Sequence, residues 1–274
     1  MVLLGVAREP RVYPDLSRAS NALARALASF AARAVQERGR FAWVISGGRT
    51  PTELFTLLRG PFRRRLPWKE TEVFFADERC VPPDRPESNF GMAWTSFLSK
   101  TPIPRYRVHR MLGEFRPPSG AARRYGRQIG PLPRRGTDPL PRFDLVLLGI
   151  GPDGHTASLF PGQPAVREER RAVVAVRRSG QPPFVPRLTL TPPALSSARE
   201  IWFLVAGEDK ARIVARIFRS GPHGDPRLPA SCVEPYGRQL WFMDRLAAAE
   251  LPAVRSRRGP GRRDRGRRRG RASP

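Results

Sequence analysis

Four short apolar runs, separated by longer stretches with helical periodicity, constrain the fold of this chain more than any other feature. The runs are residues 41–45, 73–76, 143–148 and 201–205. Strands that are apolar on both faces are typical of a parallel sheet covered by helices. Helical patterns are expected at 16–35, from Thr50 onwards and at 208–218. This alternation predicts an α/β fold with a doubly wound, mostly parallel, Rossmann-like sheet flanked by helices.

A change in composition divides the chain into two parts. Residues 1–251 contain all four runs and are predicted to form one α/β domain with a substantial core. Residues 252–274 consist mainly of Arg, Gly, Pro and Ser without apolar periodicity, which predicts a disordered, Arg-rich tail. The first eight residues lack the features of a secretion signal and are expected to form a strand. The stretch 117–141 is expected to be a surface loop with a short helix at 121–129.

The charge of the chain is strongly positive, but it does not favour a nucleic-acid protein. The net charge is +26, and only three of the 50 basic residues are lysines. That bias indicates a composition that favours arginine. The segment 255–271 holds ten arginines and one aspartate, and it has no interleaved aromatic side chains for base stacking. We therefore expect at most nonspecific, salt-dependent binding of nucleic acid by the tail.

The remaining composition is typical of a cytoplasmic protein. No apolar stretch approaches the roughly 20 residues that span a bilayer, so no membrane association is expected. Cys80 and Cys232 are the only cysteines, too few for a disulfide framework or a zinc knuckle. Cys80 is expected to be a small buried thiol. The sequence does not indicate an oligomeric state.

Each of the four apolar runs is followed by a polar or glycine-rich segment. These segments are 46–51, 77–79, 149–156 and 207–210. Ligands of open parallel sheets bind beyond the carboxyl ends of the strands. If the four strands are parallel, all four segments meet at one edge, which makes that edge the predicted site.

The first segment has the composition of a phosphate-binding turn. Ser46, Gly47, Gly48 and Arg49 stand between a strand and a helix. Glycines let the backbone approach an anion closely, and amide groups at a helix N-terminus favour negative charge. The alternative is an ordinary turn between a strand and a helix.

The third segment holds a candidate general base. His155 follows a strand in a tight glycine loop, two residues after Asp153. A neutral imidazole near pH 7 is suited to activate water. The pattern Gly149-x-Gly151-x-x-Gly154 formally matches a dinucleotide fingerprint, but Pro161 follows too soon for the full helix of such a site. His109 and His223 are expected to be surface residues.

Further charged residues are expected near the same edge. Asp77, Arg79, Arg187 and Lys210 stand at strand ends or a helix start. A guanidinium in such a place binds phosphate or carboxylate well. The alternatives are a salt bridge of Arg79 with a neighbouring acid, and solvated surface positions for Arg187 and Lys210.

Several of these segments together resemble the 6-phosphogluconolactonase family, within the wider glucosamine-6-phosphate isomerase/deaminase superfamily. The similar segments stand in family order at 46–51, 77–84 with 88–89, 149–162, 187–190 and 207–210. The resemblance implies a metal-free enzyme, without cofactor, of the oxidative pentose phosphate pathway. Its small-molecule substrate would be 6-phospho-D-glucono-1,5-lactone and its product 6-phosphogluconate.

The resemblance also implies roles for single residues. His155 would activate water for attack on the lactone carbonyl, and Asp153 would orient His155 or hold a sugar hydroxyl. The phosphate and the charge developing on oxygen would be held by the predicted loops and cations, namely Ser46, Gly47, Gly48, Arg79, Arg187 and Lys210.

Two other functions remain as alternatives. Deaminases of the superfamily carry an acid five residues beyond the histidine, where this chain has Phe160 followed by Pro161 and Gly162. The other alternative is a noncatalytic protein that binds a sugar phosphate or, through its tail, nucleic acid.

Overall fold

The computed structural model describes residues 7–134, 140–221 and 224–251. The predicted tail and most of the predicted first strand lie outside the described residues. The first described strand, β1 (Arg8–Tyr13), begins where that predicted strand was expected to end. Among the described residues, no helix combines the length and the apolar character needed to cross a bilayer.

A seven-stranded parallel sheet forms the centre of the molecule and confirms the predicted fold class. Its order is β1-β10-β9-β6-β2-β3-β5, and every described pairing in it is parallel. The four predicted apolar runs are four of its strands, β2 (Phe41–Ile45), β3 (Thr71–Phe75), β6 (Leu145–Leu148) and β9 (Glu200–Val205). The other three strands are β1, β5 (Val108–His109) and β10 (Gln239–Asp244).

A second, smaller sheet was not expected from the sequence. It contains β4 (Asp77–Arg79), β8 (Arg187–Leu190) and β7 (Val173–Val176), in that order, and both pairings are antiparallel. Strand β4 follows β3 after the single residue Ala76, so the chain passes directly from one sheet into the other. The second sheet therefore lies beside the carboxyl end of β3.

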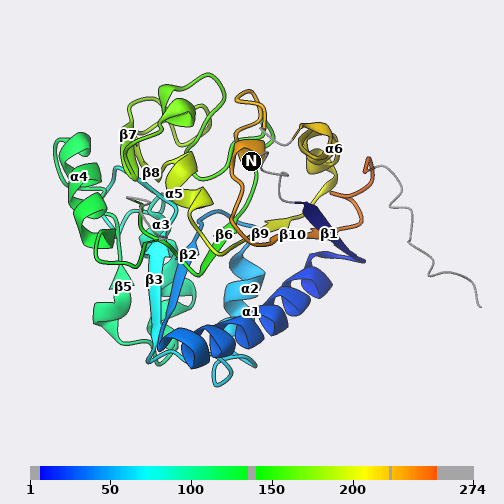
Figure 1. Ribbon diagram of the computed structural model, residues 1–274, viewed down its shortest axis with the longest axis horizontal. Coiled ribbons are helices and arrows are strands. Elements are labelled where there is room, and N and C mark those ends of the chain that lie inside the picture. Colours follow the sequence, from blue (N-terminus) through cyan, green and yellow to red (C-terminus); the bar gives the residue numbers. More distant parts are fainter. Residues whose placement is uncertain (1–6, 135–139, 222–223, 252–274) are drawn as a thin grey trace, which may run out of the picture.

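Helices cover both faces of the central sheet. The helices α1 (Leu16–Arg38) and α2 (Thr52–Arg59) lie on one side, and α6 (Ala211–Arg219) lies on the other (Figure 1). The shorter helices are α3 (Asn89–Ser96), α4 (Pro118–Ile129) and α5 (Pro192–Ser196). Asp15 begins α1 by accepting a hydrogen bond from the amide of Arg18. The helix expected from Thr50 onwards is α2, which begins at Thr52 without a side-chain cap.

The strands β2 and β6 are parallel neighbours in the sheet, and the order in which the chain adds further strands reverses between them. From β2 the chain proceeds outward to β3 and β5, and from β6 it proceeds the other way to β9 and β10. The connecting loops diverge at such a reversal and leave a crevice beyond the carboxyl ends of the strands. The segments that follow β2 and β6 are the predicted phosphate-binding turn and the segment with His155.

Candidate active site

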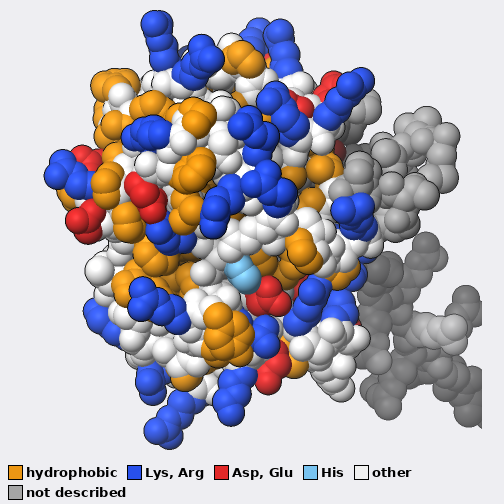
Figure 2. Space-filling model, turned by 90° about the vertical axis from the view of Figure 1, so that its left-hand side faces the viewer, with side chains coloured by type: hydrophobic (Ala, Val, Ile, Leu, Met, Phe, Trp, Pro, Cys, Tyr) orange, Lys and Arg blue, Asp and Glu red, His pale blue; other side chains and the backbone are white. Residues whose placement is uncertain are grey.

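A cavity of about 420 Å³ lies at this crevice and is lined by all four predicted segments. Nine of the ten predicted site residues line it, and the tenth, Asp153, lies directly behind His155. The face of the molecule seen in Figure 2 carries many Lys and Arg side chains and few acidic ones. The nine lining residues are Ser46, Gly47, Gly48, Arg49, Asp77, Arg79, His155, Arg187 and Lys210.

His155 and Asp153 form a hydrogen-bonded pair. The Nδ1 atom of His155 lies 2.5 Å from Oδ1 of Asp153, and the His155 amide also donates to that oxygen. Since a carboxylate accepts hydrogen bonds, we assign the ring proton to Nδ1, which leaves Nε2 with a free lone pair. Burial raises the pKa of Asp153, but the hydrogen bonds from His155 outweigh it and the net pKa is lowered. The pair is therefore ready to accept a proton at Nε2.

The ring of His155 is enclosed by close neighbours. Phe160 packs against it with ring centroids 4.7 Å apart. A Cβ atom placed on Gly151 would lie 2.0 Å from the ring atoms Nδ1 and Cε1. Only glycine at position 151 therefore leaves room for the imidazole in this position.

This close approach makes a testable difference between two glycines of one loop. We expect Gly151→Ala to displace the imidazole and to lower kcat about tenfold or more, because small misplacements of a catalytic group are costly. Gly149→Ala is the matched control, since its Cβ would meet nothing closer than 3.9 Å. The measurement is kcat of both variants with thermal unfolding as a check on folding. Equal activity of the two variants would contradict this reading of Gly151.

The turn after β2 presents backbone amides to the cavity wall. Within the described part of the chain, the amides of Gly47, Gly48 and Arg49 make no hydrogen bond. Gly48 has φ +96°, a backbone conformation that residues other than glycine rarely adopt. The hydroxyl of Ser46 donates to the carbonyl of Leu147, so Ser46 retains only acceptor capacity toward a ligand. Three free amides before a helix N-terminus are suited to hold an anionic oxygen.

Two arginines lie side by side in the small sheet. Arg79 and Arg187 are directly opposite each other in the β4–β8 pairing. Burial lowers the pKa of Arg187, and the positive charge of Arg79 lowers it further. Neither arginine makes an ion pair with a described acid, so the salt bridge considered for Arg79 is not formed there. Two adjacent cations in one cavity favour the binding of an anion.

Both guanidinium groups are held by carbonyl oxygens and still have unused donors. Arg79 donates through Nη1 to the carbonyl of Glu87 at 2.6 Å. Arg187 donates through Nη2 to the carbonyls of Gln181 and Pro183. The Nε atoms of both arginines are buried and have no partner among the described residues. Arg187 is 3% exposed, so it is not the solvated surface cation that was the alternative.

Asp77 acts as a scaffold in the wall of the cavity. One of its carboxylate oxygens accepts from the hydroxyl of Ser158 at 2.6 Å, and the other accepts from Nδ2 of Asn89 at 3.0 Å. Ser158 also donates its amide to the hydroxyl of Thr189, which ties the segment after β6 to the small sheet. Asp77 is one of the predicted site residues, and in this structure each of its carboxylate oxygens has a protein partner.

Asn89 is a cavity residue to which the sequence analysis assigned no role. Its Nδ2 atom donates to the carbonyl and the carboxylate of Asp77, which fixes the amide and leaves Oδ1 beside Gly47. The neighbouring Glu78 accepts hydrogen bonds from the amides of Asn89 and Phe90. Burial raises the pKa of Glu78 to about 7.

The remaining predicted residues have less specific surroundings. Arg49 is exposed at the mouth of the cavity, and Lys210 forms an ion pair with Asp209 at 2.8 Å. Cys80 is buried as expected, and burial raises its pKa to about 11. His109 is not the surface residue that was predicted, because it stacks on Phe74 and contacts Glu72 at 3.0 Å. His223 lies outside the described residues.

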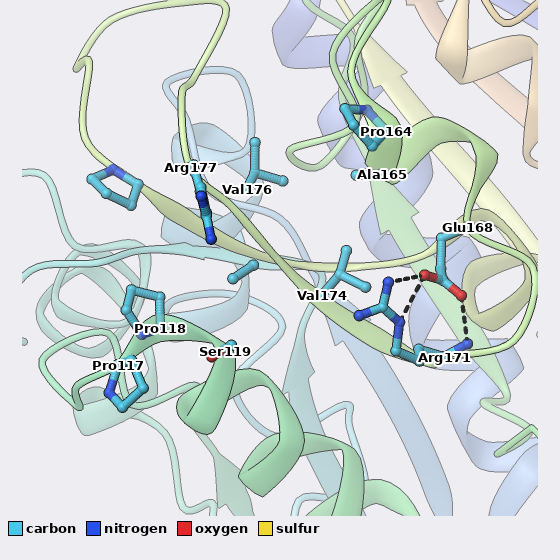
Figure 3. A pocket seen from close by; sticks show the side chains of 12 residues that line it. Pro117, Pro118, Ser119, Pro164, Ala165, Glu168, Arg171, Val174, Val176 and Arg177 are labelled. Atoms are coloured by element: carbon cyan, nitrogen blue, oxygen red, sulfur yellow. Dashed lines mark hydrogen bonds and ion pairs between the residues drawn. The ribbon is translucent and has the colours of Figure 1, made fainter.

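A second hollow does not offer comparable chemistry. It has a volume of about 390 Å³ and lies between the N-terminus of α4 and β7 (Figure 3). Its lining is mainly Pro, Ala and Val, and its one acid, Glu168, is turned toward Arg171 and paired with it. In the described part of the chain, no group of three or more His, Cys, Asp or Glu side chains is placed to hold a metal ion.

Comparisons with known proteins agree on one family. The sequence model of the family described as Glucosamine-6-phosphate isomerases/6-phosphogluconolactonase matches residues 14–242. The chain is 38% identical to the 6-phosphogluconolactonase of Synechocystis sp., over 80% of this chain and 88% of the relative. It is 37% identical to the 6-phosphogluconolactonase of Streptomyces coelicolor, over 88% of this chain and 94% of the relative.

A solved structure agrees as well. The crystal structure of 6-phosphogluconolactonase from Thermotoga maritima is 28% identical and superimposes with a TM-score of 0.75. The match covers 87% of this chain and 100% of the crystallised chain.

Proposed function

Since the chain belongs to the family of glucosamine-6-phosphate isomerases and 6-phosphogluconolactonases, we propose that it hydrolyses 6-phospho-D-glucono-1,5-lactone to 6-phosphogluconate with His155 as the general base. This is a reaction of the oxidative pentose phosphate pathway. The observation that carries the assignment of roles is that one cavity is lined both by His155, which Asp153 holds from behind, and by the Arg79–Arg187 pair. A base and a phosphate site in one cavity are what hydrolysis of a phosphorylated lactone requires.

The first step is the attack of water on the lactone carbonyl. Nε2 of His155 takes a proton from the water as its oxygen bonds to the carbonyl carbon. Asp153 holds Nδ1–H and stabilises the imidazolium that results. The 2.5 Å contact supports an orienting role for Asp153 rather than direct contact with a sugar hydroxyl.

The second step is the collapse of the tetrahedral intermediate. The carbonyl re-forms, the bond to the ring oxygen breaks, and the imidazolium returns its proton to that oxygen. The product is the open-chain acid, which loses a proton to solvent. The free amides of Gly47, Gly48 and Arg49 offer donors for negative oxygens in the cavity. The reaction consumes only water, so no cofactor is needed.

The phosphate of the substrate binds at the two arginines. Their unused donors and adjacent positive charges match a dianion better than a neutral sugar hydroxyl. The positive field of the molecule also favours the approach of an anionic substrate. Deamination is not favoured, because Phe160 is 2% exposed and occupies the position where deaminases carry an acid.

The direct test of this function is hydrolysis of freshly prepared 6-phosphogluconolactone, measured above its spontaneous rate. We expect clear acceleration, and no release of ammonia from glucosamine 6-phosphate. Ammonia release without lactone hydrolysis would overturn the proposal in favour of the deaminase.

The Arg-rich segment 252–274 is proposed to be an accessory to this function, and the enzyme is proposed to act in the cytoplasm. We expect a chain that ends at residue 251 to keep its kcat and KM within about twofold, because the cavity is formed by residues 46–210. Retention of the full chain on DNA at low salt is expected to disappear with the deletion, since ten arginines account for such binding. Loss of lactonase activity in the shortened chain would contradict the accessory role.

A further inference from the structure

Gln181 is a cavity residue on the segment between β7 and β8, and it connects the two functional pairs of the site. Its side-chain Nε2 lies 3.5 Å from Oδ2 of Asp153, the oxygen that His155 does not use. Its main-chain carbonyl accepts hydrogen bonds from the hydroxyl of Ser179 at 2.5 Å and from Nη2 of Arg187 at 3.2 Å. One residue thus contacts the partner of the base through its side chain and a phosphate-binding arginine through its backbone.

We propose that Gln181 is a positioning residue, whose side-chain amide holds Oδ2 of Asp153 so that Oδ1 faces His155. The proposal rests on the proposed function, in which His155 is the general base. A carboxylate can rotate about its Cβ–Cγ bond and has acceptor sites on both oxygens. Among the described residues, Gln181 is the one side chain within hydrogen-bond distance of Oδ2. The bond is long, and hydrogen bonds of this kind tighten when substrate closes the site.

The backbone contacts explain why this amide stays in place. Gln181 belongs to a proline-rich segment without regular secondary structure. Ser179 and Arg187 hold its carbonyl, and Arg187 is itself fixed in strand β8. The side chain of Gln181 therefore begins from an anchored position and reaches Asp153 across the cavity wall.

Replacement of Gln181 changes how strongly Asp153 interacts with the imidazolium form of His155. Without the Gln181 amide, the Asp153 carboxylate has one hydrogen-bond donor fewer and therefore interacts more strongly with the His155 imidazolium. A cation at position 181 would stabilise the Asp153 carboxylate itself and weaken that interaction. The other charged groups that face the cavity are unchanged in both variants, so a shift would report on residue 181. They are Arg49, Asp77, Arg79, Arg187, Asp209 and Lys210.

The experiment is an NMR pH titration of the histidine side chains in the full-length protein. The chain has only three histidines, and the spectrum of His155→Ala identifies the signal of His155. In Gln181→Met we expect the titration midpoint of His155 to rise by about 0.3 to 0.5 pH unit, the size expected for loss of one weak hydrogen bond. In Gln181→Lys we expect it to fall by a similar amount.

The matched control is Gln128→Met, which removes a glutamine amide 3.2 Å from Nδ1 of His109. That change should leave the His155 signal unaffected. In Gln181→Met, kcat for the lactone should fall about three- to tenfold with KM within twofold, because positioning of the base affects the chemical step. The proposal is overturned if neither Gln181 variant moves the His155 midpoint. The titration needs no turnover, so its outcome is separate from that of the lactonase assay.

Discussion

Replacement of His155 with alanine is expected to lower kcat for 6-phosphogluconolactone by about 100- to 10,000-fold. Among the described residues, the imidazole is the one base in the cavity with a free nitrogen and an orienting carboxylate, and alanine removes the acceptor for the proton of water. KM should change little, because in the proposed mechanism the arginines bind the phosphate. The rate must be corrected for spontaneous hydrolysis of the lactone.

The control for this prediction is His109→Gln, which removes a histidine that does not line the cavity. His109 lies on β5, pairs with Phe74 in the sheet and contacts Glu72. We expect this variant to retain full activity. If the His155→Ala protein is folded by thermal unfolding and still retains wild-type kcat, the proposed mechanism fails although the family assignment stands.

The second large effect is expected from Arg79→Met. Loss of the guanidinium should lower kcat/KM for the phosphorylated lactone about 10- to 150-fold, the range of a charge-assisted hydrogen bond to a buried anion. Methionine keeps much of the apolar stem, and among the described residues the Arg79 side chain makes a single hydrogen bond to the protein. We therefore expect a loss of phosphate binding rather than a loss of folding.

Unphosphorylated glucono-1,5-lactone provides an internal control for the arginine variant. It has no group for Arg79 to hold, so its hydrolysis should be nearly equal in wild type and variant. We therefore expect Arg79→Met to lose most of the preference for the phosphorylated lactone over glucono-1,5-lactone. Arg85→Met is the matched surface control, since the Arg85 side chain is 61% exposed. An equal loss on both substrates would contradict a role of Arg79 in binding phosphate.

The central sheet and the position of the site were predictable from the sequence because both depend on local patterns. Each apolar run is long enough to indicate a buried strand, and the segments after the runs contain the polar residues. The run 240–243 carries the same signal and forms β10, a strand that the sequence analysis did not assign. Strand β4 carries no such signal, because two of its three residues are acids. Both acids are buried, and hydrogen bonds satisfy their carboxylates.

The residues that complete the site could not be predicted in the same way. Asn89 and Gln181 have roles only because Asp77 and Asp153 lie beside them after folding. The pairing of Arg79 with Arg187 joins positions more than 100 residues apart in a sheet whose first strand is polar. Local patterns locate the binding edge, whereas the partners of each functional group depend on the tertiary structure.

The division of the site between two sheets has a consequence for the size of the substrate. His155 follows a strand of the central sheet, whereas Arg79 and Arg187 belong to the small sheet, and Ser158 joins the two through Asp77 and Thr189. The proposed base and the proposed phosphate site are thus linked by hydrogen bonds of 2.6 and 3.2 Å. If both roles hold, the site favours substrates in which the phosphate and the carbonyl are separated by a particular number of carbon atoms. We expect a phosphorylated lactone one carbon shorter to be a poorer substrate, because it would fit the arginines and the base less well at the same time.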